Sequence, residues 1–313
     1  GIHGTKVQDY TTDPDNPLEG QVWYNETANT LKYFYVNPGS WATGNSMNTA
    51  RYWLGSAGTQ TSALAFGGNP PQLAITESYN GTNWTEVNDL NTARRQLKGV
   101  GATNTAALAF GGESALVASE AITETWNGTN WTEVNDLNTG RYNLGSAGTN
   151  TAALAFGGQT PITAVTETWN GTNWTEVNDL NTARDKLAGA GTNTAALGFG
   201  GYGPTGAAAL TELWNGTNWT EVNDLNTARG YLGGAGTQTA ALAIGGTPAP
   251  TGNTELWNGT NWTEVADLGT ARYGLGSNGT QTTALAFGGR LPAASAATEE
   301  WNAGPVTATI TTD

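Results

Sequence analysis

The sequence predicts an all-β propeller built from repeated four-stranded sheets. A stretch at residues 79–94 returns nearly unchanged at 126–141, 169–184, 214–229 and 257–272. The arginines that begin successive repeats stand 43 to 47 residues apart, a period typical of propeller blades. Each repeat holds four short β-rich runs and shows no amphipathic helical period. These observations together favour sheets arranged around an axis over a helical solenoid.

One repeat shows the expected strands in order. Residues 54–58 are small, 63–66 form an apolar run before a Gly-Gly doublet, and 76–79 and 84–87 flank an Asn-Gly-Thr-Asn turn. Asn and Gly both tolerate positive φ, so this turn predicts a tight hairpin. The Gly- and Ala-rich first strand suits the innermost position, where strands crowd around the axis.

The two ends of the chain depart from the repeat. Residues 1–38 form an N-terminal segment with an expected hairpin at 21–35 and a second turn at 37–40, residues 39–304 form the propeller, and 305–313 form a C-terminal strand or tail. The last repeat lacks its second Trp, whereas Trp41 begins a spare fourth strand. Joining them gives six blades closed by an N-terminal strand, with 306–311 free to pair with the N-terminal hairpin. The alternative is seven blades, with 5–47 as a worn first blade and 306–311 as the final strand.

The repeat resembles the kelch repeat over about residues 31–304. The shared features are a Gly-Gly doublet, an aromatic residue after it, a Trp five residues later in five repeats, and an Arg that opens the next unit. The doublets stand at 67–68, 111–112, 157–158, 200–201, 245–246 and 288–289. Residues 20–27 and 30–33, together with the Asn-Thr-Ala-Arg units, resemble predicted structural proteins of marine tailed phages. The N-terminal segment and the C-terminal tail have no kelch counterpart.

Composition excludes several classes of function. The net charge is −14 and the 12 Lys and Arg residues are scattered, which argues against nucleic acid or an anionic membrane as partner. No run of about 18 apolar residues exists, so no membrane insertion is expected. With no Cys and one His, His3, the chain offers no nucleophile–base pair and no thiolate or imidazole metal site. We therefore expect no enzyme, no cofactor and no metal, and we interpret acidic pairs such as Glu86 with Asp89 as a solvated rim.

Two sets of residues repeat in every unit and are interpreted as structural, because a feature found in each blade normally serves the blade. The first set pairs each repeat Arg with a Glu of the third strand, as partly buried ion pairs: Arg51, Arg94, Arg141, Arg184, Arg229 and Arg272 with Glu77, Glu124, Glu167, Glu212, Glu255 and Glu299. The second set is the fourth-strand Trp, which fills space between sheets: Trp41, Trp84, Trp131, Trp174, Trp219 and Trp262. The competing interpretations are an anion or sugar site for the first set and sugar stacking for the second.

Two stretches vary between repeats: the loop between the second and third strands, and the dipeptide after each Arg. In an up-and-down blade both emerge on one face, and in kelch proteins this face commonly binds the partner, as the resemblance implies. The alternative is drift in unconstrained loops. The predicted binding residues on this variable face are Tyr52, Trp53, Arg95, Gln96, Tyr142, Asn143, Asp185, Lys186, Tyr202, Tyr231, Tyr273 and Arg290.

The sequence supports three hypotheses of function. In the preferred one, the chain is a non-enzymatic phage virion surface protein, in a tail fibre, appendage or capsid attachment. Residues 1–38 bind other virion structural proteins, and the variable face binds a host glycan or surface protein. The second is a purely structural capsid or tail decoration protein. The third is a secreted bacterial lectin-like propeller or enzyme. The oligomeric state on the particle is left open.

Overall fold

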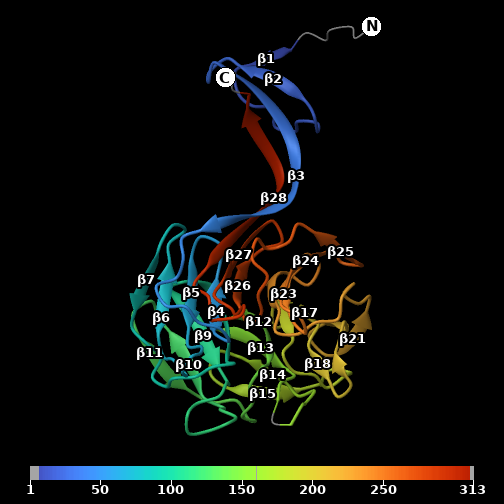
Figure 1. Ribbon diagram of the computed structural model, residues 1–313. Coiled ribbons are helices and arrows are strands. Elements are labelled where there is room, and N and C mark those ends of the chain that lie inside the picture. Colours follow the sequence, from blue (N-terminus) through green and yellow to red (C-terminus); the bar gives the residue numbers. More distant parts are fainter. Residues whose placement is uncertain (1–6, 160, 311–313) are drawn as a thin grey trace. The chain divides into compact units, whose positions relative to one another are not determined.

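The chain is all-β in the computed structural model, which describes residues 7–159 and 161–310 (Figure 1). It divides into two compact units. One comprises residues up to Ser40 together with those from Asn302 onward, and the other comprises Trp41–Trp301. β3 (Thr30–Gly44) and β28 (Thr298–Thr309) each contribute residues to both units. None of the described residues forms a helix long and apolar enough to cross a membrane.

The larger unit is a propeller-like array of antiparallel sheets, with the first strand of each repeat at one sheet edge and the second beside it. The first strands are β4 (Gly55–Gly58), β8 (Lys98–Thr103), β12 (Gly145–Thr149), β16 (Ala188–Gly191), β22 (Gly233–Gly236) and β26 (Gly276–Gly279). The second strands are β5 (Ala63–Phe66), β9 (Ala106–Phe110), β13 (Ala152–Phe156), β17 (Ala196–Phe199), β23 (Ala241–Gly246) and β27 (Thr283–Phe287). This arrangement confirms the predicted repeat of short strands.

The third and fourth strands complete each sheet. The third strands are β6 (Thr76–Tyr79), β10 (Thr123–Trp126), β14 (Thr166–Trp169), β20 (Thr211–Trp214), β24 (Thr251–Trp257) and β28. The fourth strands are β7 (Trp84–Val87), β11 (Trp131–Val134), β15 (Trp174–Val177), β21 (Trp219–Val222) and β25 (Trp262–Val265), and β3 lies beside β28. A small hairpin, β18 (Tyr202–Gly203) with β19 (Gly206–Ala207), lies in one variable loop. The shortest of these variable loops is 247–250, because β23 continues to Gly246 and β24 already begins at Thr251.

The first strands consist mostly of small residues because neighbouring sheets approach closely there. A Cβ added to Gly99 in β8 would lie 2.3 Å from the ring of Phe66 and 2.6 Å from the carbonyl oxygen of Ser56, both of which belong to the sheet of the preceding repeat. These strands contact one another in the order β4, β8, β12, β16, β22 and β26, and β26 contacts β4. Ser56 Oγ donates to the carbonyl of Ser277 at 3.2 Å, joining the first of these strands to the last.

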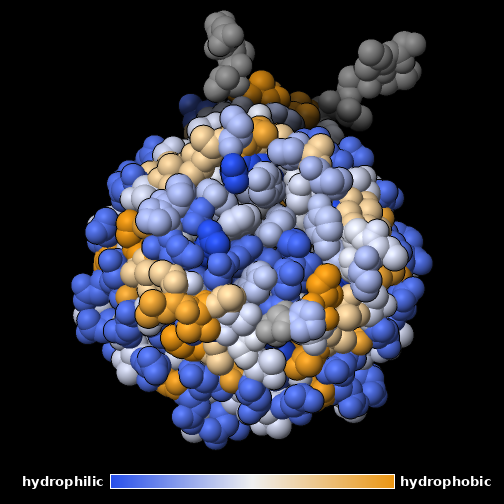
Figure 2. All heavy atoms as spheres, turned by 60° about the horizontal axis from the view of Figure 1, so that its bottom comes forward, coloured by the Kyte–Doolittle hydropathy of each residue, from blue (hydrophilic) through white to orange (hydrophobic). Residues whose placement is uncertain are grey.

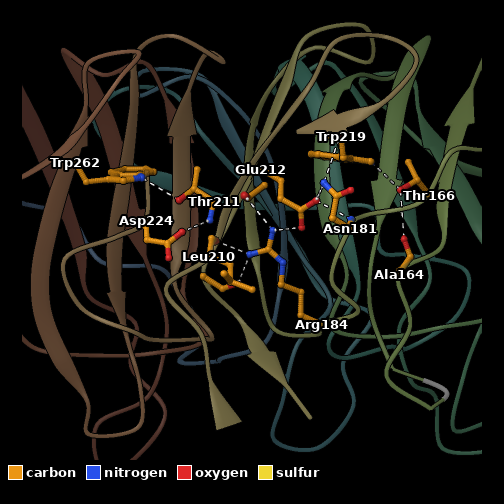
Figure 3. A network of polar contacts seen from close by, with 12 residues as sticks. Ala164, Thr166, Asn181, Arg184, Leu210, Thr211, Glu212, Trp219, Asp224 and Trp262 are labelled. Atoms are coloured by element: carbon orange, nitrogen blue, oxygen red, sulfur yellow. Dashed lines mark hydrogen bonds and ion pairs between the residues drawn. The ribbon is translucent and has the colours of Figure 1, made fainter. Parts of the chain in front are cut away.

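A buried ion pair stands inside each repeat, as Figure 3 shows for Arg184 and Glu212. Arg184 Nη2 lies 3.0 Å from Glu212 Oε1, and both side chains are almost fully buried. The second oxygen, Oε2, accepts from the backbone and side-chain amides of Asn181 at 2.7 and 2.9 Å. Arg184 Nη1 also donates to the carbonyl of Gly200 at 2.9 Å. The carboxylate is therefore neutralised and hydrogen-bonded, as burial of a charge requires. All six predicted Arg–Glu pairs form.

The fourth-strand Trp ties each sheet to the preceding one. In Figure 3, Trp219 Nε1 donates to Thr166 Oγ1 at 3.1 Å and Trp262 Nε1 donates to Thr211 at 3.0 Å. Trp41 makes the same bond to Thr254 at 3.1 Å, which gives it the position of a fourth-strand Trp. The remaining bonds are Trp84 to Thr298, Trp131 to Thr76 and Trp174 to Thr123. The predicted packing role of this Trp set thus includes a hydrogen bond between sheets.

The acidic residue after each fourth strand is structural rather than a solvated rim. Asp89 Oδ1 accepts from the backbone amide of Thr76, the first residue of the third strand, at 3.1 Å. The other four copies make the equivalent bond: Asp136, Asp179, Asp224 and Asp267. Glu86, by contrast, is exposed as expected.

The smaller unit contains β1 (Gln8–Tyr10), β2 (Val22–Asn25) and the first part of β3, and β2 and β3 form the expected hairpin. Asp13 accepts from Lys32, Asn25 and Trp23 at 2.8, 2.7 and 3.0 Å, which lowers the pKa of its carboxyl to about 2. Ile310 N donates to the carbonyl of Leu31 at 2.8 Å, so the C-terminal strand lies against the hairpin.

The second turn predicted at 37–40 is wrong. β3 continues through these residues, where Asn37 Nδ2 donates to the carbonyl of Asn302 at 2.9 Å on β28. Pairing along two long strands overrides the local turn signal of Asn-Pro-Gly-Ser. Parts of two expectations, residues 1–6 of the N-terminal segment and 311–313 of the tail, lie outside the described residues.

We predict that Glu124→Ala lowers the free energy of unfolding by about 3–5 kcal/mol, because it leaves the buried Arg94 guanidinium without a counter-charge. Glu133→Ala is the matched control: Glu133 stands opposite Glu124 in the adjacent strand, but it is exposed, so we expect a change within about 0.5 kcal/mol. Urea denaturation measures both. Equal small losses would contradict a stabilising role for the pair.

Candidate functional site

The two variable stretches of each repeat meet on one side of the propeller unit. The first residue of each post-arginine dipeptide forms a two-residue antiparallel bridge with the residue after the Gly-Gly doublet. These bridges join Tyr52 to Asn69, Arg95 to Glu113, Tyr142 to Gln159, Asp185 to Tyr202, Gly230 to Thr247 and Tyr273 to Arg290. Ten of these twelve positions carry a side chain other than Gly or Thr, and their identity changes from one bridge to the next.

The second residue of each dipeptide has a left-handed backbone. φ lies between 53° and 64° at Trp53, Gln96, Asn143, Lys186, Tyr231 and Gly274. This conformation is costly for bulky L-residues. Gly274 is also required sterically, since a Cβ there would lie 2.6 Å from the indole of Trp53. The predicted variable face includes these side chains, but no sequence pattern predicts their left-handed backbone.

The left-handed residues are linked to each other by backbone hydrogen bonds of 2.7–2.9 Å. Each N–H donates to the carbonyl of the equivalent residue in the preceding repeat. The donors and acceptors are Gln96 to Trp53, Asn143 to Gln96, Lys186 to Asn143, Tyr231 to Lys186, Gly274 to Tyr231 and Trp53 to Gly274. We call these six residues the axial ring. Because its amides satisfy one another, the ring can hold strained residues whose side chains are free to differ.

Aromatic and cationic side chains gather on the axial ring. Trp53 stacks on Tyr231, with ring centroids 5.6 Å apart and an interplanar angle of 27°, and the Arg95 guanidinium lies 5.7 Å from the Trp53 ring. Lys186 Nζ lies 5.0 Å from the ring of Tyr202 and 5.4 Å from that of Tyr231. Cation–π contacts of this kind hold flat apolar surfaces beside positive charge.

The remaining predicted residues surround this cluster. Tyr273 lies 6.0 Å from Tyr231 and the Arg290 guanidinium lies 5.2 Å from Tyr52. The half-buried Tyr142 takes part in its bridge, but no aromatic contact joins it to the cluster among the described residues. All twelve predicted binding residues therefore belong either to the axial ring or to the bridges beside it. Figure 2, which looks onto the face of these loops, shows hydrophilic residues around its centre and separate hydrophobic patches toward its edge.

Among the buried polar groups of this region, the Trp53 indole N–H and the Asp185 carboxylate are poorly satisfied. Trp53 Nε1 is a buried donor with no acceptor among the described residues. Asp185 is 0% exposed, and its charged neighbour is Lys186 Nζ at 3.0 Å from Oδ2. Burial raises the pKa of the Asp185 carboxyl, and Lys186 only partly opposes the shift. A buried donor without a partner and a desolvated carboxylate are both costly unless something else binds them.

The chemistry available here is recognition by stacking, hydrogen bonding and charge. Among the described residues no group of three or more His, Cys, Asp or Glu side chains could hold a metal ion. The bridge partners Asn69, Glu113 and Gln159 were not singled out as site residues from the sequence, although they open the variable loops. Arg95 pairs with Glu113 at 2.7 Å, and Asn69 Nδ2 donates to Tyr52 Oη at 2.6 Å.

The comparisons with known proteins give no family for this chain. A scan against protein-family models found no match, and a search of curated proteins found no similar sequence. The kelch and phage resemblances therefore stay predictions from the repeat motifs.

Asp185→Asn should raise the free energy of unfolding at pH 7. The folded state raises the pKa of this carboxyl above its ordinary value of 3.8, so the wild-type protein loses stability as the pH rises from the unfolded pKa to the folded one. The difference in the free energy of unfolding between the variant and the wild type should vanish near pH 3, where the wild-type carboxyl is protonated in both the folded and the unfolded state. Urea denaturation at the two pH values tests this, with Glu133→Gln as an exposed control. A loss of stability in Asp185→Asn at pH 7 would mean that the Lys186 pair outweighs desolvation.

Proposed function

We propose that the chain is a non-enzymatic virion surface protein whose variable face binds a host-surface glycan or protein. The observation that carries the proposal is the axial ring with its bridges. Diverse aromatic and charged side chains are concentrated there on a strained but hydrogen-bonded backbone. Strained residues persist where the surrounding structure over-determines them, and they cluster at ligand-binding sites. Trp, Tyr and Arg are the residue types that most often dominate binding energy at interfaces.

The proposal includes a closed six-bladed, kelch-like propeller. The Trp–Thr bonds support it, because Trp41 occupies the fourth-strand position beside β28. A substitution supports it too. After five of the fourth strands comes an Asn whose side-chain amide donates to the Asn-Gly-Thr-Asn turn of the next sheet. Asn223, for example, donates to the carbonyl of Thr260 at 3.0 Å. Ala266 replaces this Asn where β28 and β3 have no such turn between them.

The virion setting comes from the resemblance of the N-terminal segment and the repeats to structural proteins of marine tailed phages. In this proposal residues 1–38 attach the chain to other virion proteins. The acidic composition, with a net charge of −14, is compatible with a soluble surface component present in many copies.

Binding by the variable face is tested on a glycan microarray probed with the full chain. We expect Tyr142→Ala and Tyr273→Ala to weaken the strongest signal at least about tenfold, as loss of an aromatic anchor does. Thr132→Ala, an exposed change on the outer strand β11, should leave it unaltered. Immunogold labelling of particles from a culture that produces the chain tests the setting. Labelled particles together with an array signal insensitive to both Tyr changes would favour a decoration protein that recognises nothing.

A further inference from the structure

The centre of the propeller unit encloses a channel of about 140 Å³ lined by the first strands. Its wall is made mostly of Gly, Ala and Ser, with Lys98 as the one ionisable side chain among the lining residues. A smaller cavity of about 30 Å³ under the axial ring adds Lys186 and Tyr231, and Lys98 lines this cavity as well. Within the described part of the chain no carboxylate lines either space, although the whole chain carries a net charge of −14.

Lys98 is an exception within the repeat. The matching positions hold Gly55, Gly145, Ala188, Gly233 and Gly276, so five repeats have no side chain beyond Cβ there. Lys98 is half-buried, and no described residue forms an ion pair or hydrogen bond with its ammonium group. Loss of hydration in the channel lowers its pKa from 10.5 to about 8. A cation held there without a counter-ion destabilises the fold, so a structural role alone does not account for it.

The wall can supply further donors. β4, β8, β12, β16 and β22 each stand at one end of their sheet, and these ends face one another across the axis. An edge strand leaves alternate backbone N–H groups without a partner in the sheet. The Ser56, Ser146 and Ser277 hydroxyls donate to carbonyls of adjacent first strands, so their hydrogens are already used, and Ser277 Oγ also accepts from Gly234 N at 2.9 Å. A volume of 140 Å³ exceeds the roughly 10–15 Å³ that one water needs, so the channel has room for an ion with several waters.

We propose that the central channel is a binding site for a small oxyanion, with the Lys98 ammonium as its charged ligand and amides of the first strands as additional donors. The site is separate from the variable face in its chemistry, and it does not depend on the proposed function. Gly58, Gly148 and Gly236 line one end of the channel. At the other end Trp53, Gln96 and Tyr231 contact each other, with Gln96 Nε2 donating to Tyr231 Oη at 3.3 Å.

Sulfate is the probe, because it stays dianionic across the pH range used. Isothermal titration at pH 7 should give saturable binding to the full chain, and Lys98→Ala should weaken it at least tenfold. Ala188 occupies the matching position in another repeat, so this variant is compatible with the fold. Lys32→Ala, which removes a cation that does not line the channel, should bind sulfate as the wild type does.

A second readout separates site binding from the general stabilising effect of sulfate, which is excluded from protein surfaces. Relative to chloride at equal ionic strength, sulfate should raise the unfolding temperature of the wild type more than that of Lys98→Ala. It should also raise the Lys98 pKa above about 8, followed by NMR of the side-chain Cε–Nζ signals. Acetate in place of sulfate tests whether a carboxylate suffices. Equal sulfate affinity and equal thermal shifts in wild type and Lys98→Ala would overturn the proposal.

Discussion

The buried arginine of each repeat is the contact on which the rest of the structure depends. Its side chain binds the Glu in the third strand of the sheet that follows it. Its backbone carbonyl accepts a hydrogen bond from the Gly-Gly doublet of the sheet that precedes it. Arg94, for example, pairs with Glu124, and its carbonyl accepts from Gly68 N at 2.8 Å. One residue thus joins two sheets. An added Cβ on Gly67 would lie 2.6 Å from the same carbonyl, which explains why the doublet tolerates no side chain.

The variable residues follow directly after this fixed point. Because the arginine sets where the chain leaves one sheet and enters the next, the two residues after it keep one backbone path while their side chains differ. The axial ring and the bridges are the result. The side chains that differ between repeats therefore lie on the most constrained backbone of the unit. A partner that binds there would meet a preorganised surface, so binding would cost little conformational entropy.

Repetition made much of this predictable. Six Arg–Glu pairs, the fourth-strand role of Trp41 and the meeting of both variable stretches followed from comparing the repeats with one another. The left-handed backbone of the axial ring could not be predicted in this way, because Trp, Gln and Lys rarely adopt positive φ and no local sequence pattern indicates it. The strand at 37–40 was missed because its long-range pairing with β28 overrides a strong turn sequence. Lys98 could have been found, because it stands alone where the other repeats have Gly or Ala.

The central claim is that the six dipeptides close into one hydrogen-bonded ring. Hydrogen–deuterium exchange followed by NMR tests it directly at the backbone amides of Trp53, Gln96, Asn143, Lys186, Tyr231 and Gly274. The proposed closure predicts that all six are protected alike and exchange only with global unfolding. The Trp53 N–H donates to Gly274 across the junction of the first and last repeats, so rapid exchange at Trp53 with protection at the other five amides would show an array open there and would contradict the account.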